Sequence, residues 1–450
     1  MKLENRPKDI CSRRTAPALI ALIACLGVFQ SIQAQTISGV DRDRARGMLD
    51  IIKGDIKKNY YDPTFHGIDI EARFKSADEK IKTVDSLGQA YGVIAQVLSE
   101  FNDSHLFFYP PPRAARADYG WQMQMIGDQG YVTAVKPGSD AETKGLKPGD
   151  RLLKVDGFAP TRDNIWKMQY RYFVLRPQPG IQVEVQTGNE PPRELALKAK
   201  VTPLKTRLDF SGFSGTEDIE SVLRDIDKEE HMNRQRYAES DDILIWKMPR
   251  FDLEDAKVDE MMGKAAKHKG LILDLRGNGG GYEKTLQRML GNLFAQDVKV
   301  ADVRRRKETK PIVARTRGGD AFKGQLVVLI DSRSGSASEL LARVVQLEKR
   351  GTILGDRSAG AVMRAKGYYY EMGSGTIIYY GASITDADSI MSDGKSLEHE
   401  GVTPDELLLP TGQDLAAKRD PALARAAKLL GVELSAEKAG SLFPIEWINR

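Results

Sequence analysis

Apolar residues recur at three- and four-residue steps along residues 41–100, which is the spacing of one face of an α-helix. Pro63 and Gly67 interrupt the pattern, and it ends at residues 101–105, before the breaker at residues 110–112. We therefore expect a helical N-terminal domain over residues 40–110. The positions that carry the helical spacing are Met48, Ile51, Ile52, Ile56, Tyr91, Ile94 and Val97.

The pattern changes to strand-like alternation after residue 118. Residues 130–135 alternate between apolar and polar side chains, and the turn at residues 148–150 precedes a buried strand at residues 152–155. We expect a β-rich domain over residues 118–200 and a polar, charge-rich connector over residues 201–240. Apolar strands and helices then alternate, which indicates an α/β domain over residues 241–432 that closes with a helix at residues 416–430. Residues 433–450 are expected to form a C-terminal tail. The chain is thus a multidomain α+β protein.

The composition agrees with a chain that buries sizeable cores. It has 450 residues, of which 41% are hydrophobic and 29% are charged, and this excludes a disordered polymer. The formal net charge is +4, and the first 34 residues account for most of the basic excess, because they hold five basic and two acidic side chains. No dense basic block interleaved with aromatic residues occurs, so nucleic acid is not expected as a partner.

The first 34 residues have the order of a secretory signal peptide. Arg13 and Arg14 precede an apolar run at residues 16–29, and a small residue, Ala34, marks a cleavage site. A transmembrane anchor would need about 20 apolar residues, so no permanent membrane span is expected. Lipid anchoring at Cys25 is the alternative, but the apolar run continues past it. We expect an exported protein, periplasmic or secreted.

Cysteine and histidine limit the chemistry further. Cys11 and Cys25 both lie in the leader, so the mature chain has no disulfide, thiolate zinc site or cysteine nucleophile. The imidazole groups downstream of His66 are too widely spaced for two of them to share a helical turn. We expect no metal and no organic cofactor. The histidines are His66, His105, His231, His268 and His399.

Two strand-to-turn motifs carry the candidate chemistry. Residues 271–281 form an apolar strand that runs into a glycine-rich turn, whose free N–H groups suit either a phosphate or an oxyanion. The turn lacks the Lys-Ser/Thr of a phosphate-binding P-loop. Residues 326–331 form a second strand, and Ser336 follows where a helix begins. Helix-terminal N–H groups could stabilise negative charge there, although serine also commonly caps helices.

The two motifs in combination resemble the C-terminal processing (tail-specific) and tricorn-core serine peptidases. The resemblance rests on Asp274–Gly281 followed by Ser336-Ala-Ser-Glu, and it extends over residues 90–410. It implies a ClpP/crotonase-like catalytic domain with Ser336 as nucleophile. The oxyanion donors would be the N–H of Ala337 and one N–H from Gly279 or Gly280.

The β-rich segment resembles a PDZ domain in its phrase from Val135 to Gly157. PDZ domains bind an extended peptide at a sheet edge, and backbone N–H groups capture its terminal carboxylate. The resemblance places that carboxylate loop near Gly120 and Trp121. A domain that acts only as a lid or a spacer is the alternative.

The base departs from the tail-specific pattern. That branch uses a lysine about 25 residues after the serine, and here Ala361 occupies the position, with Lys366 as the nearest lysine. The tricorn-like branch uses a Ser-His pair before the PDZ domain, which Ser104 and His105 match. It also uses a glutamate beyond the nucleophile.

The glutamate of the tricorn-like pattern is matched by Glu398, in the phrase Glu-x-x-Gly-Val-x-Pro-Asp at residues 398–405. Glu400 is the alternative carboxylate, and His399 is interpreted as a surface residue or a substrate contact. The resemblance thus implies a tetrad in which His105 accepts the Ser336 proton while Ser104 and Glu398 support the histidine.

These inferences predict an exported serine endopeptidase that acts on protein or peptide substrates. Two alternatives stay open: a peptidase fold that binds ligands without hydrolysis, and a PDZ scaffold that presents exported proteins to a protease. The oligomeric state is also open, and a homo-oligomer is compatible with the sequence.

Overall fold

The computed structural model describes residues 37–113, 115–203, 235–373 and 377–447. The predicted signal peptide, both cysteines, His231 and most of the expected connector lie outside the described residues. No helix among the residues described is long and apolar enough to cross a membrane.

Three helices correspond to the helical periodicity of residues 41–100. Each begins at a side chain that accepts a backbone N–H of its first turn: Ser38, Asp69 and Ser86. Their apolar faces meet in one buried cluster that includes Ile52, Ile56 and Ile94. The helices are α1 (Gly39–Asn59), α2 (Ile70–Thr83) and α3 (Leu87–Ser99), with a short turn η1 (Phe65–Gly67) between the first two.

A five-stranded antiparallel sheet follows, in the order β3-β4-β5-β6-β7. Strand β3 lies at one edge, and a buried core that includes Leu152, Val155 and Val183 fills one face. A separate antiparallel pair is formed by β2, which precedes this sheet in the sequence, and β8, which follows it. The elements are β2 (Ala115–Asp118), β3 (Trp121–Ile126), β4 (Gln129–Val135), α4 (Asp140–Thr143), β5 (Arg151–Val155), α5 (Ile165–Tyr170), η2 (Arg171–Leu175), β6 (Gly180–Gln186), β7 (Arg193–Lys198) and β8 (Lys200–Pro203).

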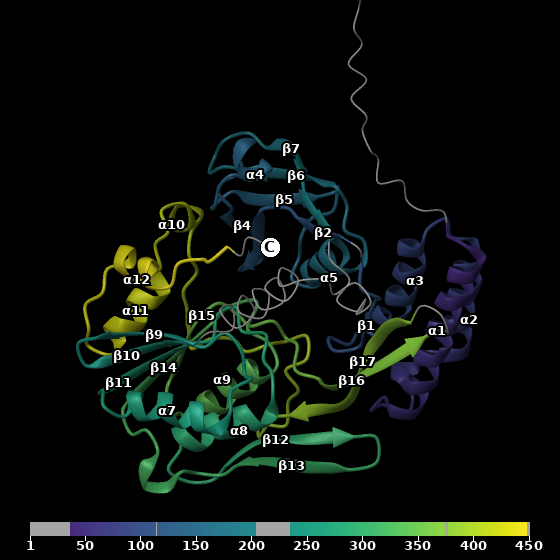
Figure 1. The fold of residues 1–450 in the computed structure, drawn as a ribbon. Helices are drawn as coiled ribbons and strands as arrows, with labels where there is room; N and C mark the ends of the chain where they lie inside the picture. Colours follow the sequence, from purple (N-terminus) through teal and green to yellow (C-terminus); the bar gives the residue numbers. More distant parts are fainter. Residues whose placement is uncertain (1–36, 114, 204–234, 374–376, 448–450) are drawn as a thin grey trace, which may run out of the picture. The chain divides into compact units, whose positions relative to one another are not determined.

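The C-terminal part is built on a six-stranded sheet in the order β18-β15-β14-β11-β10-β9, parallel except for β9 (Figure 1). Successive residues of its central strands pack into different cores: Leu271 and Leu273 face α7, α8 and α9, whereas Ile272 faces α11 and α12. Helices on both faces explain why these strands are continuously apolar. The elements are β9 (Arg236–Ser240), β10 (Ile243–Lys247), α7 (Asp255–Ala265), β11 (Gly270–Asp274), α8 (Glu283–Leu293), β14 (Gln325–Ile330), α9 (Ala337–Leu347), β15 (Thr352–Gly355), β18 (Glu406–Leu407), α11 (Pro421–Leu429) and α12 (Ala436–Leu442).

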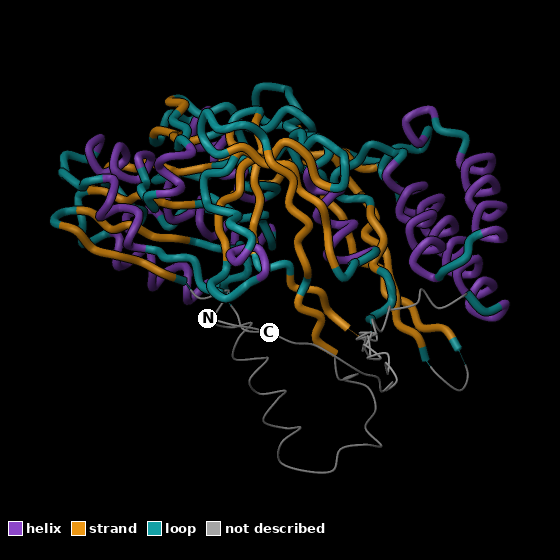
Figure 2. The backbone as a smooth tube through the Cα atoms, turned by 90° about the horizontal axis from the view of Figure 1, so that it is seen from above, coloured by secondary structure: helices purple, strands orange, loops and turns teal. Residues whose placement is uncertain are grey.

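A second, antiparallel sheet joins the three N-terminal helices to this α/β part. Strand β17 pairs with β1, which directly follows the helical segment. Ala382 and Ile384 of β17 are buried in the core of the three helices. Figure 2 shows these strands in orange reaching toward the purple helices α1–α3. The strands are β1 (Phe107–Tyr109), β12 (Val298–Arg305), β13 (Thr309–Ala314), β16 (Arg364–Met372) and β17 (Ile378–Ile390).

Three expected boundaries differ from the structure. The closing helix begins at Pro421 rather than residue 416, because Lys418 has a positive φ of 55° and Asp420 caps the new start; a short α10 (Gly412–Ala416) precedes it. The expected tail contains α12, which forms because Leu434 and Ala439 are buried against the sheet. Strands β8 and β9 occupy the two ends of the expected connector, so the large sheet begins at residue 236.

Candidate active site

Ser336 lies in a strained turn between β14 and α9. Its φ of 54° and ψ of −119° are values that a residue with a side chain rarely adopts. Two acceptors hold the conformation: the Ser336 N–H donates to the carbonyl of Ala361 at 2.7 Å and to Glu339 Oε2 at 3.0 Å. The half-buried Ser336 is thereby fixed directly before α9, at its N-cap position.

Glu339 is a fully buried carboxylate that receives four hydrogen bonds. Ser358 Oγ and the N–H of Gly360 donate to Oε1 at 2.6 and 2.7 Å, and the N–H groups of Ala361 and Ser336 donate to Oε2 at 2.9 and 3.0 Å. Burial raises the pKa of Glu339 to about 7, against the effect of these hydrogen bonds. Glu339 therefore ties the turn at residues 358–361 to Ser336.

No role for Glu339 was inferred from the sequence. The available signal was its position three residues after a serine at a helix start, which is the spacing of a capping box.

Ser104, His105 and Glu398 form a continuous hydrogen-bonded chain. Ser104 Oγ lies 2.7 Å from His105 Nδ1 and donates to Glu398 Oε2 at 2.9 Å. The Ser104 N–H donates to the other oxygen, Oε1, at 2.9 Å. Since the single Ser104 hydroxyl proton points to Glu398, Ser104 Oγ must accept from Nδ1–H. His105 is then the tautomer with an unprotonated Nε2, which can accept a proton.

The surroundings of His105 favour the neutral imidazole. Burial lowers the pKa of His105, and the Asp103 carboxylate acts in the opposite direction. Asp103 is itself buried and accepts three hydrogen bonds. The donors are the backbone N–H of His105 at 2.9 Å, the Tyr60 hydroxyl at 2.9 Å and the Thr385 hydroxyl at 2.7 Å. The histidine is therefore positioned by Asp103, which is itself held by the residue that follows α1 and by β17.

One peptide group connects the Ser336 side of the site to the Glu398 side. The carbonyl of Ala361 accepts the Ser336 N–H, and the N–H of the same peptide group, on Val362, donates to Glu398 Oε2 at 3.0 Å. Two hydrogen bonds and the width of one peptide group limit the separation of Ser336 N and Glu398 Oε2 to about 8 Å. Within the described ranges, no hydrogen bond joins His105 Nε2 to Ser336 Oγ.

The other residues considered for the base and the carboxylate lie differently. Lys366 is exposed on β16, with its Nζ 3.7 Å from Asp386 Oδ2. Glu400 is exposed. His399 is about half exposed, and its Nε2 lies 2.8 Å from the carbonyl of Asn102.

The glycine-rich turn packs directly against Ser336. A Cβ at Gly280, where φ is 96°, would lie 2.6 Å from Ser336 Cβ. The N–H of Gly280 is already used, because it donates to Asn278 Oδ1 at 2.9 Å. The N–H groups of Gly279 and Ala337 have no hydrogen-bond partner in the part of the chain that the structure describes.

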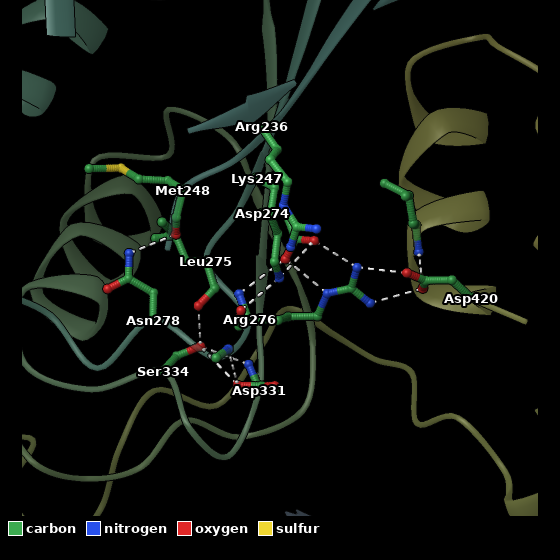
Figure 3. A network of polar contacts seen from close by, with 12 residues as sticks. Arg236, Lys247, Met248, Asp274, Leu275, Arg276, Asn278, Asp331, Ser334 and Asp420 are labelled. Carbon is green, nitrogen blue, oxygen red and sulfur yellow. Dashed lines mark hydrogen bonds and ion pairs between the residues drawn. The ribbon is translucent and has the colours of Figure 1, made fainter. Parts of the chain in front are cut away.

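A buried ionic network fixes the strand end from which this turn starts (Figure 3). The Arg276 guanidinium binds both oxygens of Asp274, at 2.9 and 2.8 Å, and both oxygens of Asp420, at 2.9 and 2.7 Å. Lys247 Nζ donates to the carbonyl of Arg276 at 2.7 Å. Burial acts to raise the pKa of Asp274, but Arg276 and Lys247 hold it well below its usual range. The carboxylate thus stays ionised and the strand end stays anchored.

Asp331 anchors the other side of the turn. Its Oδ1 accepts the N–H of Gly277 at 2.8 Å, while Ser334 Oγ donates to the carbonyl of Leu275 at 2.9 Å. The Gln124 amide of β3 donates to Asp331 Oδ2 at 2.7 Å, so the five-stranded sheet contacts the same anchor.

Gly120 and Trp121 lie at the start of β3. The N–H of Gly120 donates to Asp118 Oδ1 at 2.9 Å, and the Trp121 side chain is buried in the core of the five-stranded sheet. Among the described residues, no three histidine, aspartate or glutamate side chains gather in a group that could hold a metal ion.

Comparison with known proteins shows which family the C-terminal part resembles. Residues 242–408 match the family described as Peptidase family S41. Over these residues the chain is similar to peptidase family S41. The S41 match covers β10 to β18, and it therefore contains Ser336, Glu339, the glycine-rich turn and Glu398, but not Ser104 and His105.

Individual relatives extend the similarity beyond the S41 region. The chain is 26% identical over 250 residues to the tail-specific protease of Haemophilus influenzae, covering 54% of this chain and 33% of that protein. It is 23% identical over 407 residues to a homolog of tricorn protease in Streptomyces coelicolor, covering 83% and 31%. The chain thus spans about a third of the length of these two relatives. The crystal structure of mature CPAF has the same fold, with a TM-score of 0.62 at 15% identity over 84% of this chain and 94% of that one.

Proposed function

We propose that this chain is an exported serine endopeptidase that hydrolyses peptide bonds in protein or peptide substrates, with Ser336 as nucleophile and His105 as base. The observation that carries the proposal is the Ala361–Val362 peptide group, which hydrogen-bonds to Ser336 on one side and to Glu398 on the other. It brings the strained serine and the Ser104–His105–Glu398 chain to one place.

The first half of the reaction forms an ester between substrate and enzyme. His105 Nε2 takes the proton from Ser336 Oγ as the oxygen attacks the substrate carbonyl carbon. The N–H groups of Ala337 and Gly279 stabilise the negative charge that develops on the carbonyl oxygen. Gly279 is preferred over Gly280 because the Gly280 N–H is occupied by Asn278. His105 then gives its proton to the leaving amine as the C–N bond breaks.

The second half releases the acyl group. His105 removes a proton from a water molecule, the resulting hydroxide attacks the ester carbon, and the proton returns to Ser336 Oγ as the C–O bond breaks. In each half the imidazolium forms transiently. The Ser104 hydroxyl donates to the Glu398 carboxylate and accepts from His105 Nδ1–H, and this polarised hydrogen-bond chain stabilises the imidazolium.

Two further parts of the chain fit this function. The five-stranded sheet with helices α4 and α5 supports a PDZ-like module, which would receive extended polypeptide at the β3 edge. The order of charged, apolar and small residues in residues 1–34 supports export. Both features suit a protease that acts on exported proteins.

Loss of peptide cleavage in a single serine variant tests the proposal. Purified chain is incubated with casein and with a quenched fluorescent peptide, alongside Ser336→Ala and the control Ser332→Ala from the same turn. We expect Ser336→Ala to lose cleavage of both substrates while its far-UV circular dichroism stays unchanged, and Ser332→Ala to retain cleavage. Undiminished cleavage by Ser336→Ala would overturn the proposal.

A further inference from the structure

A groove of about 350 Å³ lies between α3 and the α5–η2 segment. Leu106 and Phe107, which directly follow His105, form part of its lining. Segment α5 is held in place here, because the Tyr170 hydroxyl donates to the carbonyl of Phe108 in β1. The groove is therefore attached to the same segment that presents the histidine.

The floor of the groove is open because α3 turns its smallest residues toward it. Gly88, Gly92, Ala95 and Ser99 lie four, three and four residues apart and so share one face of the helix. A Cβ at Gly92 would meet no atom within 4 Å. Glycine in mid-helix is unfavourable for helix formation, so its presence here leaves space at a conformational cost.

The opposite wall is positively charged and has no acidic partner. Lys167, Arg171 and Arg176 are exposed and line the groove. In the described ranges none of the three forms an ion pair, and none of the lining residues is acidic. Apolar side chains, including Leu106, Tyr170 and Leu175, also line the groove. Such a surface attracts anionic groups of a ligand, and its apolar side chains can bury an apolar group of the same ligand.

We propose that this groove is an accessory substrate site that binds a peptide segment in which an apolar side chain lies next to carboxylates. The apolar side chain would occupy the space above Gly92, and the carboxylates would pair with Arg171, Arg176 and Lys167. The inference rests on the proposed peptidase function, since it assigns the groove to substrate residues outside the scissile bond. It names acidic, apolar-containing polypeptide as the preferred substrate class.

Equilibrium binding to the full chain with Ser336→Ala tests the groove without any turnover. Fluorescence anisotropy is measured with a labelled peptide of alternating leucine and glutamate, and with the matched peptide in which every glutamate is glutamine. We expect the acidic peptide to bind more tightly, and its advantage to shrink as the salt concentration rises from 50 to 500 mM.

Variants of the wall and of the floor separate charge from space. We expect Arg171→Gln with Arg176→Gln to weaken binding of the acidic peptide by about three- to ten-fold, since exposed ion pairs are individually weak. Gly92→Leu fills the floor and favours the helix, so it should weaken binding of both peptides while thermal stability is maintained or increased. Lys438→Gln, which removes one exposed cation in α12, controls for a general loss of positive charge and should bind like the parent.

Equal binding of the acidic and neutral peptides, or unchanged binding in both the double variant and Gly92→Leu, would overturn the proposed groove. Because binding is measured in an inactive background, failure of the groove leaves the proposed catalysis untouched. Absence of peptide cleavage by the wild-type chain, with binding intact in the Ser336→Ala background, would instead count against the catalytic assignment.

Discussion

Replacing Glu339 by glutamine places an amide in a cluster built for two carboxylate oxygens. In the native site Oε1 receives Ser358 Oγ and the N–H of Gly360, and Oε2 receives the N–H groups of Ala361 and Ser336. A glutamine has one oxygen and one NH₂ group, so whichever way it turns, its NH₂ faces two donors. At least one backbone N–H must lose this acceptor, because only Ser358 Oγ, a hydroxyl, can turn to accept from the NH₂.

The size of the effect follows from those lost acceptors. If the NH₂ faces Ala361, the partly buried Ala361 N–H has no partner, which costs up to about 1–3 kcal/mol. The Ser336 N–H keeps its bond to the Ala361 carbonyl, but the turn that supplies this carbonyl must move away from the amide. Since misplacement by about 1 Å can cost a factor of about 100 in rate, we expect kcat to fall about 100-fold with little change in KM.

The pH dependence of stability gives an independent signature. Burial raises the pKa of Glu339 to about 7 from a model-compound value of 4.5. Between those values the folded chain retains a proton that the unfolded chain has lost. The contribution of Glu339 to the free energy of unfolding is therefore fully present below about pH 4.5, falls by about 1.4 kcal/mol per pH unit up to about pH 7, and is flat above it. Glutamine removes this slope.

The assay is urea unfolding at pH 5.5, 6.5 and 8, together with kcat and KM on one peptide. Glu400→Gln, which changes an exposed carboxylate, is the control. If Glu339→Gln keeps kcat within twofold of wild type and shows the same pH slope in its free energy of unfolding, the positioning role assigned to Glu339 is refuted.

Three further predictions concern the base, the supporting carboxylate and the glycine-rich turn. His105→Ala should lower kcat/KM at least 1,000-fold, and Lys366→Ala should leave it within twofold; the opposite ranking of the two variants would restore a lysine base. The wild-type kcat/KM should rise with pH with an apparent pKa below 6.5, because burial lowers the pKa of His105. Glu398→Gln should reduce kcat more than Glu400→Gln with little change in KM, measured on one peptide, because only Glu398 contacts the Ser-His pair; a dominant Glu400 effect would count against this. Gly280→Ala should abolish cleavage of the same peptide and lower the urea midpoint, because its Cβ would lie 2.6 Å from the Ser336 Cβ; normal activity would show that the turn can move away.

The local elements of the site could be predicted because each depends on residues that are close in the sequence. An apolar strand that ends at residue 331 and a helix face that starts near Leu340 are enough to place Ser336 at a strand-to-helix turn. Likewise, consecutive glycines after residue 276 predict a turn with accessible N–H groups. The helices of the N-terminal part follow from their spacing for the same reason.

What the sequence could not supply depends on contacts between distant segments. Glu339 acquires its role only because the turn at residues 358–361 folds back onto it. The choice between Gly279 and Gly280 depends on how the Asn278 side chain turns, and no spacing rule predicts that. The tail was misjudged because Leu434 and Ala439 are too few to show a helical period, although the sheet buries both.

The most direct test of the peptidase assignment is covalent labelling by a fluorophosphonate, with the modified residue identified by peptide mass spectrometry. A fluorophosphonate reacts with a serine oxygen only when a nearby base removes its proton, so labelling reports the nucleophile and its activation together. We predict one adduct per chain, on Ser336, which is absent in Ser336→Ala and forms much more slowly in His105→Ala. An adduct on another serine, or cleavage of casein by a chain that no fluorophosphonate labels, would contradict the account.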